Sequence, residues 1–327
     1  MVNVKQKFKT KLMRGDHTSY IVLFKFCSAL VLVFLALIFI FRKGTTLGGI
    51  IEGGIIESVG VLFDIFILGV VFHYFKKKGE KQQEIERYKE EIDDFRDWNE
   101  KEAMFRNVGN IKRLVKLGVK NLPLYFCYLK DAKLENISLE GANFNGANLE
   151  NVTIDGVKTN LDKVIFQGCK FNHIFIRDAK GHEIKFSGLR VKNPTFFDSD
   201  FSNAKISDCK FLKDKEVLRG WPNAECPYFI NTIFSEAEIT DSIFKEAYFK
   251  YTNFEDTEFH RVSFEGSSFD KVDFKNAIFN EVDFTNTKGL WIDQLREAKI
   301  LYKVKGLGLE IENVLKEEKP ELFEKPS

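Results

Sequence analysis

The chain has 327 residues and a formal net charge of +1, with 49 basic and 48 acidic side chains. This balance excludes a global positive field of the kind that binds nucleic acid non-specifically. The five cysteines and five histidines are scattered without a CxxC pair, which excludes a disulfide scaffold and a zinc site. The sequence contains no phosphate-binding glycine loop and no nucleophile elbow, so we expect no enzyme activity, no cofactor and no metal.

Two apolar segments follow a basic N-terminus at residues 1–18. Residues 26–41 carry no charge, and extension back past Lys25 to Ser19 gives a segment long enough to cross a bilayer. A buried helix of a soluble protein and a cleaved signal peptide are alternatives for this first segment. A second apolar run at 55–75 follows directly and ends at three lysines, 76–78. The two runs together predict a transmembrane hairpin at 19–78, with spans at about 19–41 and 55–75.

The distribution of charge around the two segments predicts their orientation. Basic residues precede the first span and follow the second, whereas the glycine-rich connection at 42–54 holds only Arg42 and Lys43. The positive-inside rule therefore places both termini and the rest of the chain in the cytoplasm. We expect a multi-pass protein of the plasma (inner) membrane that contacts membrane lipid. Unpaired cysteines suit this compartment, because the cytosol keeps thiols reduced.

Two acidic residues in the second span, Glu57 and Asp64, are seven positions apart and share one helix face. A carboxylate near the bilayer centre costs roughly 2.5–3.5 kcal/mol, so a lipid-facing position is disfavoured. In one interpretation this face makes an oligomer contact, an ion or proton pathway, or a ligand sensor. In the other, a protonated Asp64 is hydrogen-bonded within the hairpin or an oligomer. Both interpretations predict that the face packs on protein.

Residues 79–120 are predicted to form a helical linker and an N-terminal cap. In the charge-dense stretch 79–103, apolar residues fall at a/d spacing for two heptads: Ile85, Tyr88, Ile92 and Phe95. This pattern is typical either of a short coiled coil that supports a homo-oligomer or of a solvated single helix. In 103–117, one side of a second helix would carry Phe105, Val108, Ile111 and Leu114 or Val115.

Residues 121–289 carry an apolar side chain at every fifth position, with a smaller residue two positions before it. On an α-helix, residues five apart are rotated by roughly 140°, so the series would not share a face. In extended backbone, residues two apart point to the same side. The chain must therefore turn once in every unit to keep these pairs inward. The longest uninterrupted run is a predicted core ladder of Phe244, Phe249, Phe254, Phe259, Phe264, Phe269, Phe274, Phe279 and Phe284.

This pattern resembles the pentapeptide-repeat family, whose consensus is A(D/N)LXX. The segments GANFNGANLENV at 141–152 and SNAKISDCKF at 202–211 match it well. The resemblance implies a right-handed quadrilateral parallel β-helix with four units per coil and about seven coils. Cys127, Cys169 and Cys209 occupy the small inward position and are expected in the core. Residues 290–327 are expected to form a C-terminal helical cap, with a helix at about 292–303 covering the last coil.

The repeat is interrupted twice, at 155–164 and at 212–228. The first interruption is consistent with a local bulge. The second is three positions longer than the three units that would keep the register, and it holds the candidate partner residues Lys213, Lys215, Arg219 and Trp221. A protruding loop on a rigid scaffold is a reasonable recognition element. The alternative is a tolerated insertion that folds against a side wall.

Three functions follow from these features. The first is a membrane-anchored, non-enzymatic scaffold that presents the β-helix in the cytoplasm to a protein partner. The second is an oligomeric membrane effector or pore that uses the face of Glu57 and Asp64. The third comes from the family resemblance, which includes DNA mimics that bind topoisomerases. Segment 229–289 has 12 acidic and 6 basic side chains, a modest excess for a DNA mimic, and nucleic acid is not an expected partner. No residue identifies the partner, the oligomeric state or the biological process.

Overall fold

The structure is a computed structural model that describes residues 48–214 and 226–325. The chain divides into two compact units, Met1–Gly79 and Glu80–Ser327. The helix α3 (Gly48–Asp94) contributes residues to both of them. The second unit contains α4 (Lys101–Lys116), a β-helix and a C-terminal cap.

None of the helices in the described ranges is both long enough and apolar enough to cross a membrane. The predicted transmembrane hairpin is therefore not supported. Its first span, 19–41, lies outside the described residues, whereas the second, 55–75, lies within α3.

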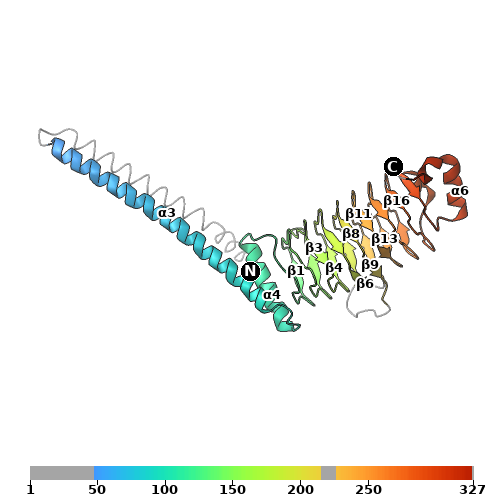
Figure 1. The fold of residues 1–327 in the computed structure, drawn as a ribbon, viewed down its shortest axis with the longest axis horizontal. Helices are drawn as coiled ribbons and strands as arrows, with labels where there is room; N and C mark the ends of the chain where they lie inside the picture. Colours follow the sequence, from blue (N-terminus) through green and yellow to red (C-terminus); the bar gives the residue numbers. More distant parts are fainter. Residues whose placement is uncertain (1–47, 215–225, 326–327) are drawn as a thin grey trace, which may run out of the picture. The chain divides into compact units, whose positions relative to one another are not determined.

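The strands form a parallel β-solenoid of about eight turns, one more than expected, in which short strands stack as rungs (Figure 1). One sheet has the order β1-β2-β4-β7-β10-β13-β15, a second β17-β16-β14-β11-β8-β5-β3, and a third β12-β9-β6. A fourth ladder consists of isolated bridges from Ser138 to Asp273. The first sheet comprises β1 (Lys133–Glu135), β2 (Thr153–Asp155), β4 (Phe175–Arg177), β7 (Thr195–Phe197), β10 (Tyr228–Ile230), β13 (Tyr248–Lys250) and β15 (Ser268–Asp270). The second comprises β3 (Ile165–Gln167), β5 (Lys185–Ser187), β8 (Lys205–Ser207), β11 (Glu238–Thr240), β14 (Glu258–His260), β16 (Ile278–Asn280) and β17 (Ile300–Tyr302). The third comprises β6 (Arg190–Lys192), β9 (Lys210–Leu212) and β12 (Ile243–Phe244).

The turn between units has one recurring backbone conformation. In the regular units, the second residue after the large inward residue has a positive φ, from 41° at Asn193 to 106° at Gly156. Asparagine, aspartate and glycine adopt this left-handed region most readily. Phe126, His173 and Tyr251 also adopt it, whereas no β-branched residue does so in the described part of the chain. The corner of every unit therefore limits which side chains the sequence can place there.

The phenylalanines of the predicted ladder, Phe244 to Phe284, are buried and stack on one another along the β-helix. The Phe229 and Phe249 ring centroids are 4.8 Å apart, and those of Phe249 and Phe269 are 5.3 Å apart, with nearly parallel ring planes. Such pairs contribute about 0.5–1.5 kcal/mol each beyond the area they bury. Gly181 occupies an inward position without a side chain, and the Phe201 ring of the next turn lies 2.8 Å from where its Cβ would be. The stack thus fills the gap that the glycine leaves.

The two interruptions have different structures. At the first, Ile154 pairs with Ile176, so this turn is two positions longer than a regular one, and buried Leu161 takes the inward position. At the second, Phe211 pairs with Phe244 and Phe196 with Phe229. This turn is thirteen positions longer than a regular one, such as the turn that pairs Phe249 with Phe269. The ladder continues across the insertion without a missing rung.

The N-terminal cap differs from the expected linker in two respects. Ile92 is buried in the core, and Ile85 and Tyr88 pack against it, so the a/d residues of α3 contact the chain's own core. A coiled coil is not supported, and a fully solvated helix is also wrong for these residues. In α4, Ile111 and Leu114 are buried as predicted, but Phe105 is 61 % exposed.

The C-terminal cap continues the sheet before it becomes helical. The predicted helix at 292–303 is wrong, because α5 (Ile292–Arg296) ends early and β17 then pairs with β16. Leu301 stacks on Phe279, which places it inward like a further repeat residue. The helical part of the cap follows, with α6 (Leu309–Glu318) and the 3-10 helix η1 (Pro320–Phe323) burying Leu315 and Leu322.

The conformation of the corners gives a first prediction. Asn276 is exposed and has a φ of 56°. Asn276→Val should lower the free energy of unfolding by about 1–2 kcal/mol, because a β-branched side chain is strained in the left-handed region. Asn276→Gly should be neutral or slightly stabilising. Denaturant unfolding of the full chain measures both, and equal stability of the two variants would contradict this account of the corners.

The three inward cysteines give a second prediction. Burial raises the pKa of the thiols of Cys127, Cys169 and Cys209 from 9.0 to about 12. In the unfolded chain these thiols ionise first, so their stabilising effect is complete below pH 9 and is lost as the pH rises towards 12. At pH 10, ionisation of each thiol in the unfolded chain should lower the free energy of unfolding by up to about 1.4 kcal/mol. Unfolding measured from pH 8 to pH 10.5 tests this, with a variant carrying alanine at all three positions as the control. An identical pH slope in the two proteins would show that the thiols ionise equally in both states.

Candidate interaction surface

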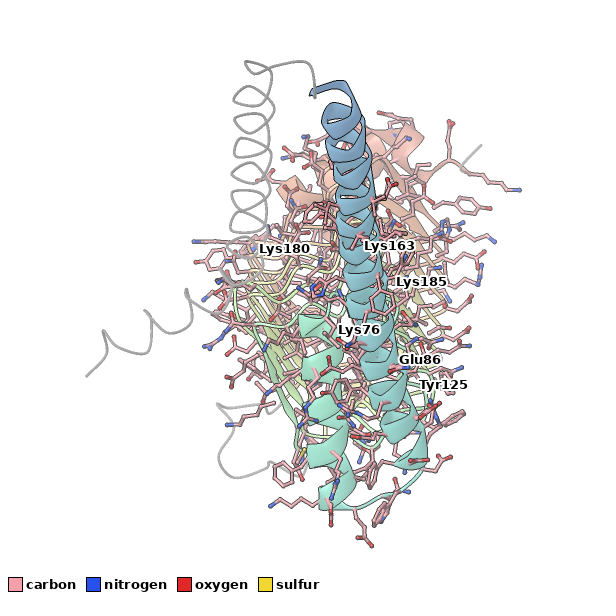
Figure 2. The ribbon with its side chains drawn as sticks, turned by 90° about the vertical axis from the view of Figure 1, so that its left-hand side faces the viewer. Lys76, Glu86, Tyr125, Lys163, Lys180 and Lys185 are labelled. Atoms are coloured by element: carbon pink, nitrogen blue, oxygen red, sulfur yellow. The ribbon has the colours of Figure 1, made fainter. Side chains whose placement is uncertain are left out.

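The outward side chains of the β-helix are arranged in rows, because each strand lies in register with the strand one turn away. Opposite charges occupy neighbouring positions in most of these rows. Examples are Lys130 with Glu150 at 2.9 Å, Lys163 with Glu183 at 3.6 Å, and Lys303 with Glu281 at 2.8 Å. The side chains that form these rows project from the sides of the β-helix, as Lys163 and Lys185 show in Figure 2.

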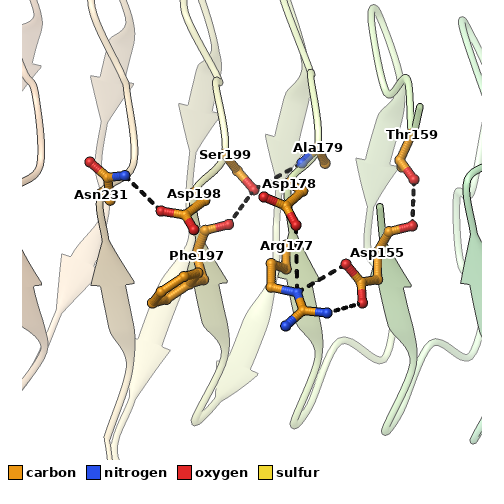
Figure 3. Close-up of polar contacts among 9 residues, drawn as sticks. All are labelled: Asp155, Thr159, Arg177, Asp178, Ala179, Phe197, Asp198, Ser199 and Asn231. Carbon is orange, nitrogen blue, oxygen red and sulfur yellow. Dashed lines mark hydrogen bonds and ion pairs between the residues drawn. The ribbon is translucent and has the colours of Figure 1, made fainter. Parts of the chain in front are cut away.

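Figure 3 shows how such a paired row is built at the corner of the first sheet. Arg177 donates to both carboxylate oxygens of Asp155 on the previous turn, with Nε and Nη2 at 3.0 and 2.6 Å. This hydrogen bond raises the pKa of the Arg177 guanidinium. Further along the same edge, Asn231 Nδ2 donates to Asp198 at 2.6 Å. Each exposed pair contributes little to stability, but the register brings each of these carboxylates to a donor on the adjacent turn.

Five cations each have a like charge as a neighbour in their row, and we call them the basic patch. They come from adjacent faces of the second and third sheets and from consecutive turns: Lys170, Lys185, Arg190, Lys205 and Lys210. Arg190 pairs in register with Lys170 on one side and with Lys210 on the other. Lys185 pairs with Lys205 in the same way. All five side chains are exposed.

Four of the five cations of the basic patch lack an ion-pair partner among the described residues. Lys205 contacts Glu238 at 3.0 Å. In the ranges that the structure describes, the other four cations form no ion pair. Like charges directly opposite each other on neighbouring strands are destabilising, by an amount on the order of 0.2–1 kcal/mol for each pair. The fold therefore tolerates a local cost here that it avoids in the paired rows.

The side chains between the two rows of cations are short. Ser187 and Ser207 lie in register, and the Ser207 hydroxyl donates to that of Ser187 at 3.2 Å. Gly188 forms the corner beside them, with no atoms of neighbouring residues within 4 Å of where a Cβ would be. Asp208 forms the corresponding corner one turn later and is exposed. The five cations thus flank a strip of short polar side chains that carries one carboxylate.

Of the residues singled out in the insertion, the structure describes only Lys213, which directly follows β9 and its patch residue Lys210. Lys213 is exposed and lies 3.7 Å from Glu246, while Lys215, Arg219 and Trp221 lie outside the described residues. Asp64 is exposed on α3, and the side chain of Glu57 is not among those described. The predicted packing of their face on protein stays a prediction.

A signal for the basic patch was present in the sequence. Lys170, Arg190 and Lys210 follow one another at intervals of four repeat units, and the same interval separates Lys185 from Lys205. Because four units make one turn, like charges at this interval predict a stack on one face. The five-residue pattern alone does not reveal it, since that pattern records only the inward positions.

Two segments of the chain match models of this kind of repeat. Residues 225–291 match the pentapeptide repeat region, and residues 124–158 match pentapeptide repeats in eight copies. The β-helix is a pentapeptide-repeat domain. The repeat forms four ladders of strands and bridges, and each unit has inward side chains and a left-handed corner residue.

Solved structures similar to this pentapeptide-repeat domain include QnrB1, described as a plasmid-mediated fluoroquinolone resistance protein. It has 15 % identity and a TM-score of 0.41, and the match covers 60 % of this chain and 91 % of that one. HetL, a pentapeptide-repeat protein involved in heterocyst differentiation regulation in Nostoc sp. strain PCC 7120, has 14 % identity and a TM-score of 0.20. That match covers 60 % of this chain and 93 % of HetL. No curated protein matches the chain.

Proposed function

We propose that the chain is a non-enzymatic protein-interaction module whose pentapeptide-repeat domain binds an acidic segment of a partner protein. The observation that supports this proposal is the basic patch. Four of its cations lie next to like charges and form no ion pair within the described residues, whereas other rows hold ion pairs such as that of Arg177 with Asp155. Surface charge that lowers stability and makes no stabilising contact is typical of a binding surface.

The surroundings of the basic patch favour a short acidic segment over nucleic acid. The patch covers three turns, which is on the order of 10 Å along the axis at about 4.8 Å per turn. Beyond Lys205, the same row continues with Glu238 and Glu258. A long polyanion would run onto these carboxylates and onto the acidic segment 229–289. Single-stranded nucleic acid also binds by stacking bases on aromatic rings. The residues that lie between the cations are Ser187, Gly188, Ser207 and Asp208, none of which is aromatic.

The binding of a fluorescent oligoglutamate peptide to the full chain tests this proposal. Fluorescence anisotropy should show binding that weakens with salt, because exposed charges are screened. Arg190→Glu combined with Lys210→Glu should weaken binding at least tenfold. The same variant should unfold at about the denaturant concentration of the wild type, because Arg190→Glu makes the contact with Lys170 attractive whereas the contact between positions 190 and 210 stays one of like charge.

The matched control is Lys133→Glu combined with Lys299→Glu, which changes the net charge equally at exposed positions elsewhere. It should keep at least half of the wild-type affinity. An equal loss in the two double variants would mean that net charge, and not the patch, binds the peptide. Tighter binding of single-stranded DNA or of anionic lipid vesicles through the same residues would overturn the choice of a protein partner.

We further propose that α3 and the preceding apolar segment attach this module to the plasma (inner) membrane, with both termini and the pentapeptide-repeat domain in the cytoplasm. The observation in favour is a run of exposed large apolar side chains on α3 that ends before Lys76. Leu62, Leu68 and Phe72 are 62 %, 66 % and 71 % exposed. Apolar surface of this extent marks contact with lipid or with protein, which includes a second copy of the chain. The basic residues that follow would contact lipid headgroups.

Membrane attachment predicts a specific fractionation result. The full chain should stay with membranes after washes with high salt and alkaline carbonate, which remove proteins held only by charge. A variant lacking residues 19–78 should appear in the supernatant. Lys76, Lys77 and Lys78 replaced by glutamine serve as the control for attachment by charge alone, and this variant should remain with the membrane. Release of the full chain by carbonate would contradict insertion of the apolar segments.

A further inference from the structure

The N-terminal cap contains a pocket of about 590 Å³ between the last part of α3 and α4. It belongs to the second compact unit, and both of its walls are helical. Its lining combines arginines, an amide and aromatic rings: Arg87, Tyr88, Phe105, Asn110 and Arg113, together with Glu91. The pocket lies apart from the basic patch of the β-helix in sequence and takes no part in the function proposed above.

Asn110 positions one of the arginines of this pocket. The residue is fully buried, and its Oδ1 accepts a hydrogen bond from Arg113 Nη1 at 2.7 Å. A hydrogen bond to a buried amide restrains the guanidinium, so Arg113 is held at the pocket wall.

Two arginines lie beside the same aromatic ring in the pocket. The guanidinium carbons of Arg87 and Arg113 are 4.9 and 5.4 Å from the centroid of the Tyr88 ring. Neither arginine forms an ion pair within the described residues. Gly109 leaves room for the Arg113 guanidinium, which lies 3.3 Å from the place of a Cβ. Planar guanidinium groups are suited to hydrogen bonding with an oxyanion.

The other charged residues determine which anion fits. Glu102 and Arg106 pair with each other at 3.1 Å and cancel. Arg87 and Arg113 then face the single carboxylate of Glu91, which leaves a net charge of +1 in the pocket lining. A singly charged carboxylate balances this charge, whereas a doubly charged phosphate would be repelled by Glu91.

The exposed aromatic side chain of the pocket indicates what the carboxylate is attached to. Phe105 lies on the pocket wall and is 61 % exposed, although the pattern of α4 predicted it inward. Covering such a ring with an apolar group is favourable. We propose that the cap pocket binds a small organic carboxylate with an apolar or aromatic body. Arg87 and Arg113 hold the carboxylate, Asn110 positions Arg113, and Phe105 and Tyr88 contact the body.

Equilibrium dialysis of the full chain in detergent with radiolabelled benzoate tests this inference. Benzoate should bind at one site per chain. Benzamide, which has the same ring without the charge, should compete at least tenfold less well. Acetate, which has the charge without the ring, and inorganic phosphate should also compete at least tenfold less well.

Three substitutions locate the site. Arg87→Gln, at an exposed position, should weaken benzoate binding about tenfold or more, because it removes a donor to a charged group. Asn110→Leu should also weaken benzoate binding, because it removes the acceptor that positions Arg113. Phe105→Ala should lower the affinity for benzoate but not for acetate. Arg190→Gln, in the basic patch, is the matched control and should leave benzoate binding unchanged.

Several outcomes would overturn the inference. Benzoate binding that is insensitive to both Arg87→Gln and Asn110→Leu would place the ligand elsewhere or in the micelle. Preferential binding of phosphate would replace the carboxylate with a different anion. No binding of benzoate to the wild type at millimolar concentration would show that the pocket does not hold this class of ligand.

Discussion

The whole β-helix depends on one backbone constraint, the left-handed residue that turns the chain once in every repeat unit. It keeps two side chains of each unit inward and places each strand in register with the strand one turn away. The inward positions then become continuous columns, which the phenylalanines fill by stacking. The outward positions become continuous rows for the same reason. A charge in such a row always meets the same neighbours, one turn before and one turn after, so the placement of surface charge is as regular as the core.

This regularity explains why the surface, and not the core, carries the functional information. The ladder from Phe244 to Phe284 consists of the same buried side chain on every turn. Its residues therefore do not distinguish one turn from another. The rows do distinguish the turns. Several rows place opposite charges on adjacent turns, as at Asp241, where the hydrogen bond from Arg261 lowers the pKa of the carboxyl group. The row of Lys170, Arg190 and Lys210 instead places three cations on consecutive turns, and we infer the binding surface from this difference.

The sequence was sufficient to predict the β-helix, because its period of five fits neither a helix nor a flat strand. It was less reliable where tertiary contacts compete with local pattern. The helix predicted at 292–303 is interrupted because Leu301 fills the column above Phe279, which stabilises a further strand. Phe105 fits the apolar side of α4 by spacing, yet Met104 takes the buried position beside it. The basic patch and the cap pocket join residues from different turns or different helices, so they become visible only when the register and the packing of α3 on α4 are known.

The insertion between Phe211 and Phe229 shows how tolerant such a fold is to added chain. The ladder passes from Phe211 directly to Phe244 one turn later, so the inserted segment leaves and returns at one corner without disturbing a rung. The chain on the departing side is held by Asn193, whose side-chain oxygen accepts a hydrogen bond from the backbone amide of Asp214. The entropic cost of closing a loop rises only slowly with its length. This corner is therefore a natural attachment point, where segments of other lengths and sequences can be exchanged while the scaffold keeps its geometry.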